Sequence, residues 1–182
     1  KDVELITFLK KNFSDEIKNK RLEIISGDVL NLKIENLKLK NNEYKVVANI
    51  PYYITGEIIR FFLENKMQPS SMTLLTQKEV TDRIVAREKK ESILSISVKV
   101  YGEPKYFGKV SARYFSPKPK VDSAIISIKN IKNPFKNGTE QELFFKIVRA
   151  GFSHKRKVLV SNLSQFFPKE KILKIFEELK IN

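Results

Sequence analysis

The sequence contains no cysteine, a single histidine and no long apolar run. Without cysteine there is no disulfide framework, no thiolate zinc site and no cysteine nucleophile. The single histidine lies within Ser153-His154-Lys155-Arg156-Lys157, which lacks the partners of a catalytic triad or a His-based metal site and indicates a solvated basic face. No run could cross a bilayer, and the first residues lack the layout of a secretion signal. We therefore expect an intracellular protein that needs neither membrane nor metal, cytoplasmic or, in a eukaryote, nucleolar or organellar.

Positive charge dominates the chain, because 35 lysines and arginines against 21 aspartates and glutamates leave a formal net charge of +14. Such a field concentrates polyanions, so RNA, DNA or an acidic membrane surface would fit as a partner. A coding bias towards lysine, asparagine and isoleucine would also explain much of the excess. Clustering of the cations is what separates the two interpretations.

Apolar spacing predicts strands that alternate with helices, which is typical of an α/β protein with a mostly parallel sheet. Leu5, Leu9 and Phe13 recur every fourth residue and indicate a first helix. Further helices are expected at 55–64, 77–87 and 93–101, and strands at 22–25, 44–48, 72–76, 105–110 and 123–128.

The last two expected strands have no helix between them, only a proline-rich loop from Arg113 to Lys120. Strands joined in this way are most simply antiparallel neighbours at one sheet edge. Beyond them, Thr139 with Glu142 has the form of a capping box, and Pro168 opens a final helix. We expect a main domain over residues 1–132 and a small helical C-terminal domain over residues 133–182.

Asp28 directly follows the first expected strand, at the edge where open α/β sheets bind ligands. A carboxylate there can accept hydrogen bonds from an exocyclic amine such as that of a cofactor adenine. Gly27-Asp28 is equally consistent with a plain turn between a strand and a loop.

Asn49-Ile50-Pro51-Tyr52 follows the second expected strand and has more distinctive chemistry. The lone pair of adenine N6 is delocalised into the ring, so the amine is a poor nucleophile. The Asn49 side-chain oxygen and the carbonyl of Ile50 or Pro51 can accept its two hydrogens and aim the lone pair at a methyl donor. Tyr52 offers a flat face to an extracted base, although a loop with a tyrosine that merely packs is the alternative.

Two segments combine features of RNA contact. The loop Arg113-Tyr114-Phe115-Ser116-Pro117-Lys118-Pro119-Lys120 mixes aromatic rings, on which bases stack, with cations that attract phosphates. A second cluster lies at or beyond the end of the helix that follows Thr139 and would hold phosphates without reading bases. A stiff connection and a solvated face are the alternatives. The candidate RNA-binding residues are Arg113, Lys118, Lys120, Arg149, Lys155, Arg156 and Lys157.

Over roughly 22–163 the chain resembles the ribosomal RNA small-subunit adenine dimethyltransferases, and the order and spacing of the shared motifs agree. The related erythromycin-resistance methyltransferases share the Asn-Ile-Pro-Tyr element and the Pro-Lys-Pro-Lys-Val loop, whereas the other two motifs resemble the dimethyltransferases more. The motifs are Asn49-Ile50-Pro51-Tyr52, Gln77-Lys78-Glu79-Val80 with Arg83, Phe115 through Ser123, and Phe152 through Leu163.

This resemblance implies a Rossmann-like class I methyltransferase sheet with a small helical C-terminal domain, in a monomer that uses S-adenosylmethionine to dimethylate adenines of small-subunit ribosomal RNA. It implies that Asp28, with Val29, contacts the cofactor adenine, and that Glu4 is the acid that grips its ribose. It also places Asn49, as part of the Asn49 to Tyr52 segment, against both the cofactor and the target amine, with Phe115 stacked on the target base.

The glycine-rich loop that approaches the methionine end of the cofactor in this family does not occur in the sequence. Either the chain is part of a longer protein, or it cannot hold the cofactor unaided, and we expect it to bind S-adenosylmethionine weakly by itself. The second hypothesis for its function is therefore a non-catalytic RNA-binding protein on the same fold, such as a ribosome-assembly or transcription factor.

Overall fold

The computed structural model describes residues 2–181, which form two compact units that divide between Leu39 and Lys40. The first unit contains helices α1 (Val3–Asn12) and α2 (Ser14–Lys18) and the 3-10 helices η1 (Val29–Asn31) and η2 (Ile34–Leu37). Asp2 caps α1, because its carboxylate accepts a hydrogen bond from the backbone N–H of Leu5 at 2.9 Å. The helix expected near Leu5 is thus confirmed.

The prediction of a strand at 22–25 is wrong, since these residues pair with no other strand in the part of the chain that the structure describes. Leu22 and Ile25 are 37% and 49% exposed, so they do not form a buried strand of the kind that a short apolar run suggests. Four apolar residues cannot by themselves distinguish a strand from irregular chain, because a strand forms only where a neighbour satisfies its backbone groups.

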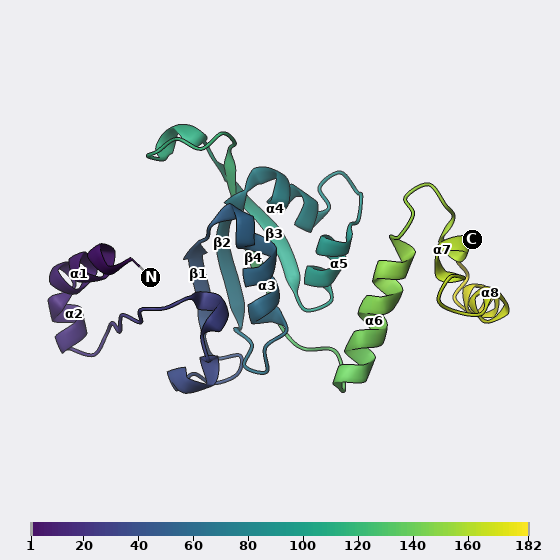
Figure 1. Cartoon of the computed structure of the whole chain (residues 1–182), viewed down its shortest axis with the longest axis horizontal. Coiled ribbons are helices and arrows are strands. Elements are labelled where there is room, and N and C mark those ends of the chain that lie inside the picture. The colour runs from purple at the N-terminus through teal and green to yellow at the C-terminus, as the bar shows by residue number, and fades with distance from the viewer. Residues whose placement is uncertain (1, 182) are drawn as a thin grey trace. The chain divides into compact units, whose positions relative to one another are not determined.

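The second unit is built on a four-stranded sheet with the order β1-β2-β4-β3 (Figure 1). Strands β1 and β2 are parallel, whereas β4 runs antiparallel to both β2 and β3. The α/β class and the antiparallel edge hairpin are confirmed, but only one strand pair of the described sheet is parallel, fewer than expected. The strands are β1 (Lys45–Asn49), β2 (Ser71–Gln77), β3 (Glu103–Val110) and β4 (Ser123–Lys129).

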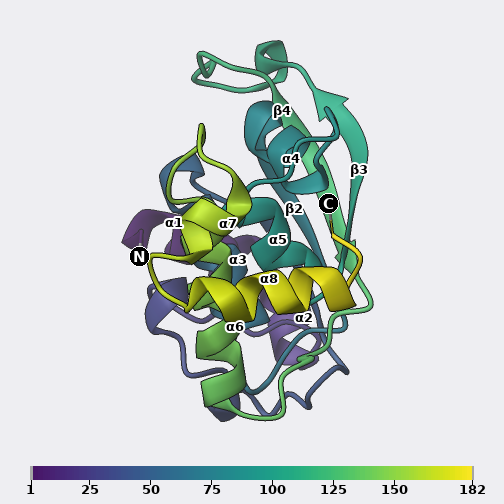
Figure 2. The same ribbon diagram turned by 90° about the vertical axis from the view of Figure 1, so that its right-hand side faces the viewer.

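Helices α3 (Thr55–Leu63), α4 (Lys78–Val85) and α5 (Ile93–Lys99) lie on one face of the sheet (Figures 1 and 2). The apolar side of α3 is buried, and β2 alternates buried and half-buried residues as a strand with one covered face does. The core of this unit includes Ile58, Ile59, Met72, Leu74, Ile126 and Ile128.

The strand register brings the ends of all four strands to one edge of the sheet. Asn49, the last residue of β1, pairs with Leu75 near the end of β2. Ser123, the first residue of β4, pairs with Gln77 at the end of β2 and with Val110 at the end of β3. The segments that leave β1, β2 and β3 therefore all begin at this edge.

Three further helices follow the sheet, namely α6 (Gly138–Gly151), α7 (Leu159–Leu163) and α8 (Lys169–Glu178). They share a small core around Ala150, Leu163 and Ile172. The expected capping box of Thr139 and Glu142 is wrong, because Asn137 caps α6 and accepts a hydrogen bond from the Glu140 N–H at 2.9 Å. An asparagine accepts this bond as well as a threonine does, so the helix begins earlier in the sequence than Thr139.

The proline-led final helix is confirmed, since Pro168 caps α8. Because residues 40–182 form one compact unit, the expected domain boundary between 132 and 133 stays a prediction. None of the helices formed by residues 2–181 has the length and apolar character that a bilayer crossing requires.

Candidate functional site

A cavity of about 360 Å³ opens at the sheet edge where the strand ends meet. One wall is the segment that follows β1, and the other is the loop between β3 and β4, so residues far apart in the sequence face the same space. Its volume lies within the range of pockets that bind small molecules. The residues that line this base pocket, as we call it, are Asn49, Ile50, Pro51, Tyr52, Phe115, Ser116, Pro117 and Pro119.

The first wall of the base pocket is held by a short turn. Ile50 is 6% exposed and anchors the chain directly after β1. The carbonyl of Pro51 then accepts a hydrogen bond from the Ile54 N–H at 3.2 Å, and the Tyr52 carbonyl accepts one from the Thr55 hydroxyl at 3.1 Å. Asn49 is exposed at the end of β1 and lines the pocket, and the strand and this turn fix its backbone on both sides.

The side chain of Tyr52 in this wall bonds to a residue of β4. Its hydroxyl lies 2.5 Å from the hydroxyl of Ser123, which is fully buried at the start of β4. Sequence reasoning did not single out Ser123 as a site residue, although the motif from Phe115 ends on it. A serine gives no signal of this role until the fold places it opposite a tyrosine.

The second wall is the loop that follows β3 and begins with η4 (Ala112–Tyr114). Asp122 closes this loop, because its carboxylate accepts the Ala112 N–H at 2.9 Å and pairs with the Lys109 ammonium at 2.7 Å. The hydrogen bond from Lys109, followed by the one from Ala112, lowers the pKa of Asp122. Phe115 is half-buried in the pocket, so the structure brings it together with the segment from Asn49 to Tyr52.

The cations of this loop do not line the base pocket. Arg113, Lys118 and Lys120 are all exposed. The Arg113 guanidinium lies 4.8 Å from the ring centre of Tyr114 and donates to its hydroxyl at 2.7 Å. They belong to the loop that forms the second wall, next in sequence to residues that line the pocket.

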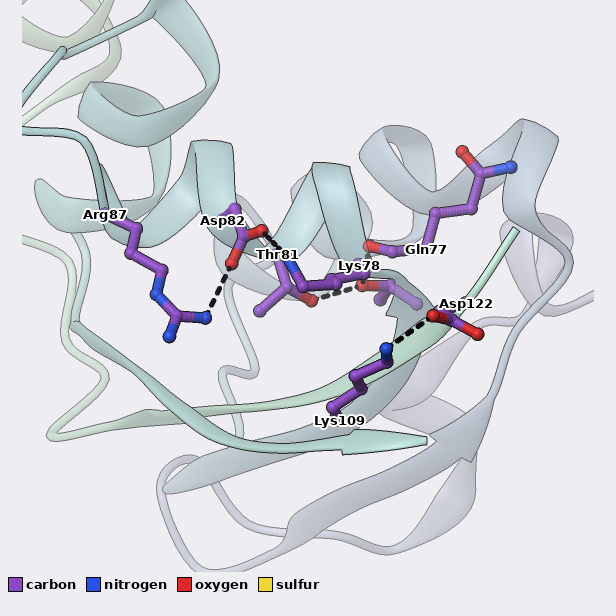
Figure 3. A network of polar contacts seen from close by, with 8 residues as sticks. Gln77, Lys78, Thr81, Asp82, Arg87, Lys109 and Asp122 are labelled. Atoms are coloured by element: carbon purple, nitrogen blue, oxygen red, sulfur yellow. Dashed lines mark hydrogen bonds and ion pairs between the residues drawn. The ribbon is translucent and has the colours of Figure 1, made fainter. Parts of the chain in front are cut away.

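A polar network lies along α4, next to the loop between β3 and β4 that forms the second wall of the base pocket (Figure 3). The carboxylate of Asp82 bonds to the Lys78 ammonium and, at 3.3 Å, to the Arg87 guanidinium. Burial by itself would raise the pKa of Asp82, but the hydrogen bonds from Lys78 and Arg87 outweigh it and lower the pKa. Deeper in the core, the hydroxyls of Thr76 and Thr81 bond to each other at 2.7 Å and fasten the end of β2 to α4.

The residues expected to bind the cofactor lie in both units. Asp28 caps η1 and accepts a hydrogen bond from the Leu30 N–H at 3.2 Å, with Val29 as the first residue of η1. Glu4 is exposed in the first turn of α1. Asn49 belongs to the second unit. The shared cofactor site of Asp28 and Asn49 thus stays a prediction.

The second basic cluster follows α6. Arg149 lies in the last turn of that helix, and the segment Lys155 to Lys157 lies beyond it, all exposed. The Asn162 side-chain amide donates to the carbonyl of Gly151 at 2.8 Å and to that of His154 at 3.1 Å, so a buried residue fixes the course of this segment. His154 is exposed, as expected of a solvated basic face.

A cleft of about 800 Å³ lies between this segment and helices α3 and α5. Lys155 and Lys157 line the cleft, whereas Arg149 and Arg156 do not. Three cations from the opposite side also line it, and the sequence did not indicate them as RNA-binding residues because they lie in different elements. They are Arg60, Arg83 and Lys90.

The fold is that of ribosomal RNA methyltransferases. A dimethyladenosine transferase from Plasmodium falciparum superposes with a TM-score of 0.78 at 25% identity, over 99% of this chain and 72% of that protein. The 23S rRNA methyltransferase ErmE superposes with a TM-score of 0.73 at 23% identity, over 100% of this chain and 70% of that one, and supports the fold alone.

The family model "Ribosomal RNA adenine dimethylase" matches residues 1–182, and the chain belongs to this family. A ribosomal RNA small subunit methyltransferase A of Fusobacterium nucleatum is 41% identical over 184 residues, which cover 100% of this chain and 68% of the relative. A protein of the same name from Dehalococcoides mccartyi is 41% identical over 142 residues, 78% of this chain and 49% of the relative. The chain thus spans between about half and two thirds of these relatives.

Proposed function

We propose that the protein transfers methyl groups from S-adenosylmethionine to the N6 amine of adenines in small-subunit ribosomal RNA, and that it adds two methyl groups to each of two adjacent adenines. The observation that carries this proposal is the base pocket. It combines an amide, backbone carbonyls and two aromatic side chains in a space suited to one splayed-out base. Membership of the adenine dimethylase family agrees with this chemistry.

In the proposed reaction the target base lies between Tyr52 and Phe115, which offer ring faces for stacking. The side-chain oxygen of Asn49 accepts one N6 hydrogen. The backbone carbonyl of Ile50 or Pro51 accepts the other N6 hydrogen, since a carbonyl oxygen can accept two bonds even where, as at Pro51, it already accepts one from Ile54. These two acceptors draw the N6 lone pair out of conjugation and fix its direction. The methylated nitrogen is cationic and loses its proton readily, so no general base with a shifted pKa is required.

S-adenosylmethionine, when bound, supplies an electrophilic methyl group on a sulfonium. The side chains of this chain fit the cofactor, since a carboxylate such as that of Asp28 can accept several hydrogen bonds at once, including one from an adenine amine. We assign Asp28 and Val29 to the adenine, Asn49 to the side of the cofactor that faces the target base, and Glu4 to the ribose.

The basic residues would bind phosphates on both sides of the target nucleotide. Arg113, Lys118 and Lys120 flank the base pocket, and Lys155 and Lys157 line the cleft. Phosphate contacts fix the register of the RNA, and the base pocket then selects the adenine. We assign Arg149 and Arg156 to the same RNA surface. A monomeric state, a reaction without a metal ion and an intracellular setting in the compartment of ribosome maturation stay predictions.

Transfer of tritiated methyl groups to immature small subunits tests this function in the full-length protein. Asn49→Ala removes one of the two acceptors of the target amine, so we expect a loss of about 100-fold in transfer with unchanged RNA affinity. Val47→Ala is the matched control, because it changes an exposed residue of the same strand that does not line the pocket. RNA binding without any transfer by the unmodified protein would contradict the proposal and support a non-catalytic assembly or transcription factor.

A further inference from the structure

We propose that Asp122 and Ser123 are positioning residues that hold the two aromatic walls of the base pocket at a fixed separation. Neither residue lines the pocket. Each is bonded to a different wall, and the two are consecutive in the chain. The inference rests on the proposed function and extends it to residues that touch neither the base nor the methyl donor.

Ser123 is suited to orient Tyr52 because it is itself immobile. It is fully buried and is paired on both sides, with Gln77 of β2 and Val110 of β3. A tyrosine ring that is packed on one side alone can still swing about χ1, which moves its far end by several times as much as its near end. The hydrogen bond at that far end, 2.5 Å between the two hydroxyl oxygens, holds the ring of Tyr52 in one position.

Asp122 performs the corresponding task for the loop that carries Phe115. Its carboxylate bonds to the Ala112 N–H and to the Lys109 ammonium, which joins the start and the end of the loop. Figure 3 shows the contact with Lys109. Its backbone carbonyl accepts the Lys78 N–H at 3.0 Å and so fastens the same point to the start of α4. Phe115 lies between the joined ends, and its position depends on this closure.

The two residues act through other groups, so their loss should affect the alignment of the target base more than its binding. A base that stacks at a slightly wrong angle still gains most of the stacking free energy. Its N6 lone pair, however, no longer points at the methyl donor, and misalignment of reacting atoms lowers the rate of the chemical step. A merely structural role would instead lower stability and RNA affinity together.

The test uses single-turnover methyl transfer at saturating RNA and cofactor in the full-length protein, alongside RNA affinity and thermal unfolding. We expect Ser123→Ala to slow transfer about 10-fold with unchanged RNA affinity. Ser127→Ala, a buried serine of the same strand remote from the pocket, is the matched control and should leave the rate unchanged.

A double-mutant cycle with Tyr52→Phe separates positioning from simple loss of packing. Tyr52→Phe keeps the ring and removes the hydroxyl, so the bond to Ser123 is already absent in that background. Ser123→Ala should then cause no further loss, because both changes remove the same interaction. Independent, multiplied losses would overturn the inference, and so would a Ser123→Ala rate equal to that of Ser127→Ala.

Asp122 gives a graded version of the same test. Asp122→Asn retains an oxygen for the Ala112 N–H but loses the ion pair with Lys109, whereas Asp122→Ala loses both. Transfer should therefore fall further in Asp122→Ala than in Asp122→Asn, and Glu79→Ala, an exposed residue with the same charge change, should not alter the rate. Equal rates for all three variants would overturn this part. Failure of the unmodified protein to methylate RNA would instead contradict the proposed function.

Discussion

The base pocket and the packing between α5 and α6 treat a tyrosine hydroxyl in opposite ways. In the pocket the Tyr52 hydroxyl is bonded to Ser123. Just beyond α5, Tyr101 is 1% exposed, and its hydroxyl has no hydrogen-bond partner among the described residues. Its ring instead stacks on Phe145 of α6 at 6.4 Å and meets Phe135 edge-on at 5.8 Å. A hydrogen bond fixes the position of a side chain, whereas aromatic packing only keeps rings close together. The base pocket therefore orients Tyr52, while the aromatic rings around Tyr101 hold helices together.

The largest expected effect lies in the base pocket. Phe115→Ala removes one stacking face from the target base, and stacking on an aromatic ring contributes about 1 to 3 kcal/mol, so transfer should fall about 10- to 100-fold. Tyr114→Ala is the control, because this neighbouring aromatic residue is 69% exposed and does not line the pocket. Equal losses for the two variants in the methyl-transfer assay would show that the loop acts as a general aromatic surface.

The next effect concerns the basic segment, where the cations attract phosphate but select no base. Replacement of Lys155, Arg156 and Lys157 by alanine should weaken RNA binding about 10-fold or more and reduce the slope of log K against log salt by about 2. Filter binding at several salt concentrations measures both quantities. The control replaces three exposed lysines of α8, Lys169, Lys171 and Lys174, with the same change in net charge. An equal change in slope for both triple variants would mean that total charge matters rather than the basic segment.

A smaller effect is expected at Asp82, which supports the sheet edge without entering the pocket. Asp82→Asn should lower the free energy of unfolding by about 1 kcal/mol at neutral pH while methyl transfer is retained. The pKa of Asp82 is lowered in the folded state, so its contribution is complete above the ordinary value of 3.8 and is lost as the pH falls through the lower folded pKa. Denaturant unfolding of both proteins across the acid range measures this. A difference that persists at the lowest pH would contradict the assignment, and Glu79→Gln, 82% exposed, should show little change.

The sequence predicts the elements of the second unit well because their signals are local. The helix that begins at Thr55 follows from apolar spacing, and the hairpin whose second strand begins at Ser123 follows from the absence of a helix between two strands. The strand at 22–25 and the capping box at Thr139 fail for a shared reason, since each rests on a few residues whose state depends on neighbours. An asparagine two residues earlier was an equally good cap.

The base pocket shows the same division between local and non-local information. Asn49 and Phe115 carry chemistry that can be read from residue type and from a position after a strand. Ser123 and Arg60 could not be found in this way, because an isolated serine or arginine has no distinctive pattern. Only strand register places Ser123 opposite Tyr52, and only helix packing places Arg60 on the cleft of about 800 Å³.

The smallest expected effect is at Tyr101, where the comparison of the two tyrosine hydroxyls becomes a measurement. Because this hydroxyl is buried without a partner among residues 2–181, Tyr101→Phe removes an unsatisfied group and should leave the free energy of unfolding at neutral pH unchanged or slightly higher. Burial, with a smaller contribution from the charge of Glu64, raises the pKa of Tyr101 above its ordinary value of 10.0. The unfolded chain would therefore ionise this tyrosine first, and the wild-type protein should lose stability above that pH faster than Tyr101→Phe does. Denaturant unfolding between neutral and strongly alkaline pH measures both effects. A clear loss of stability in Tyr101→Phe at neutral pH would mean that the hydroxyl is bonded in solution, and the contrast with Tyr52 would then disappear.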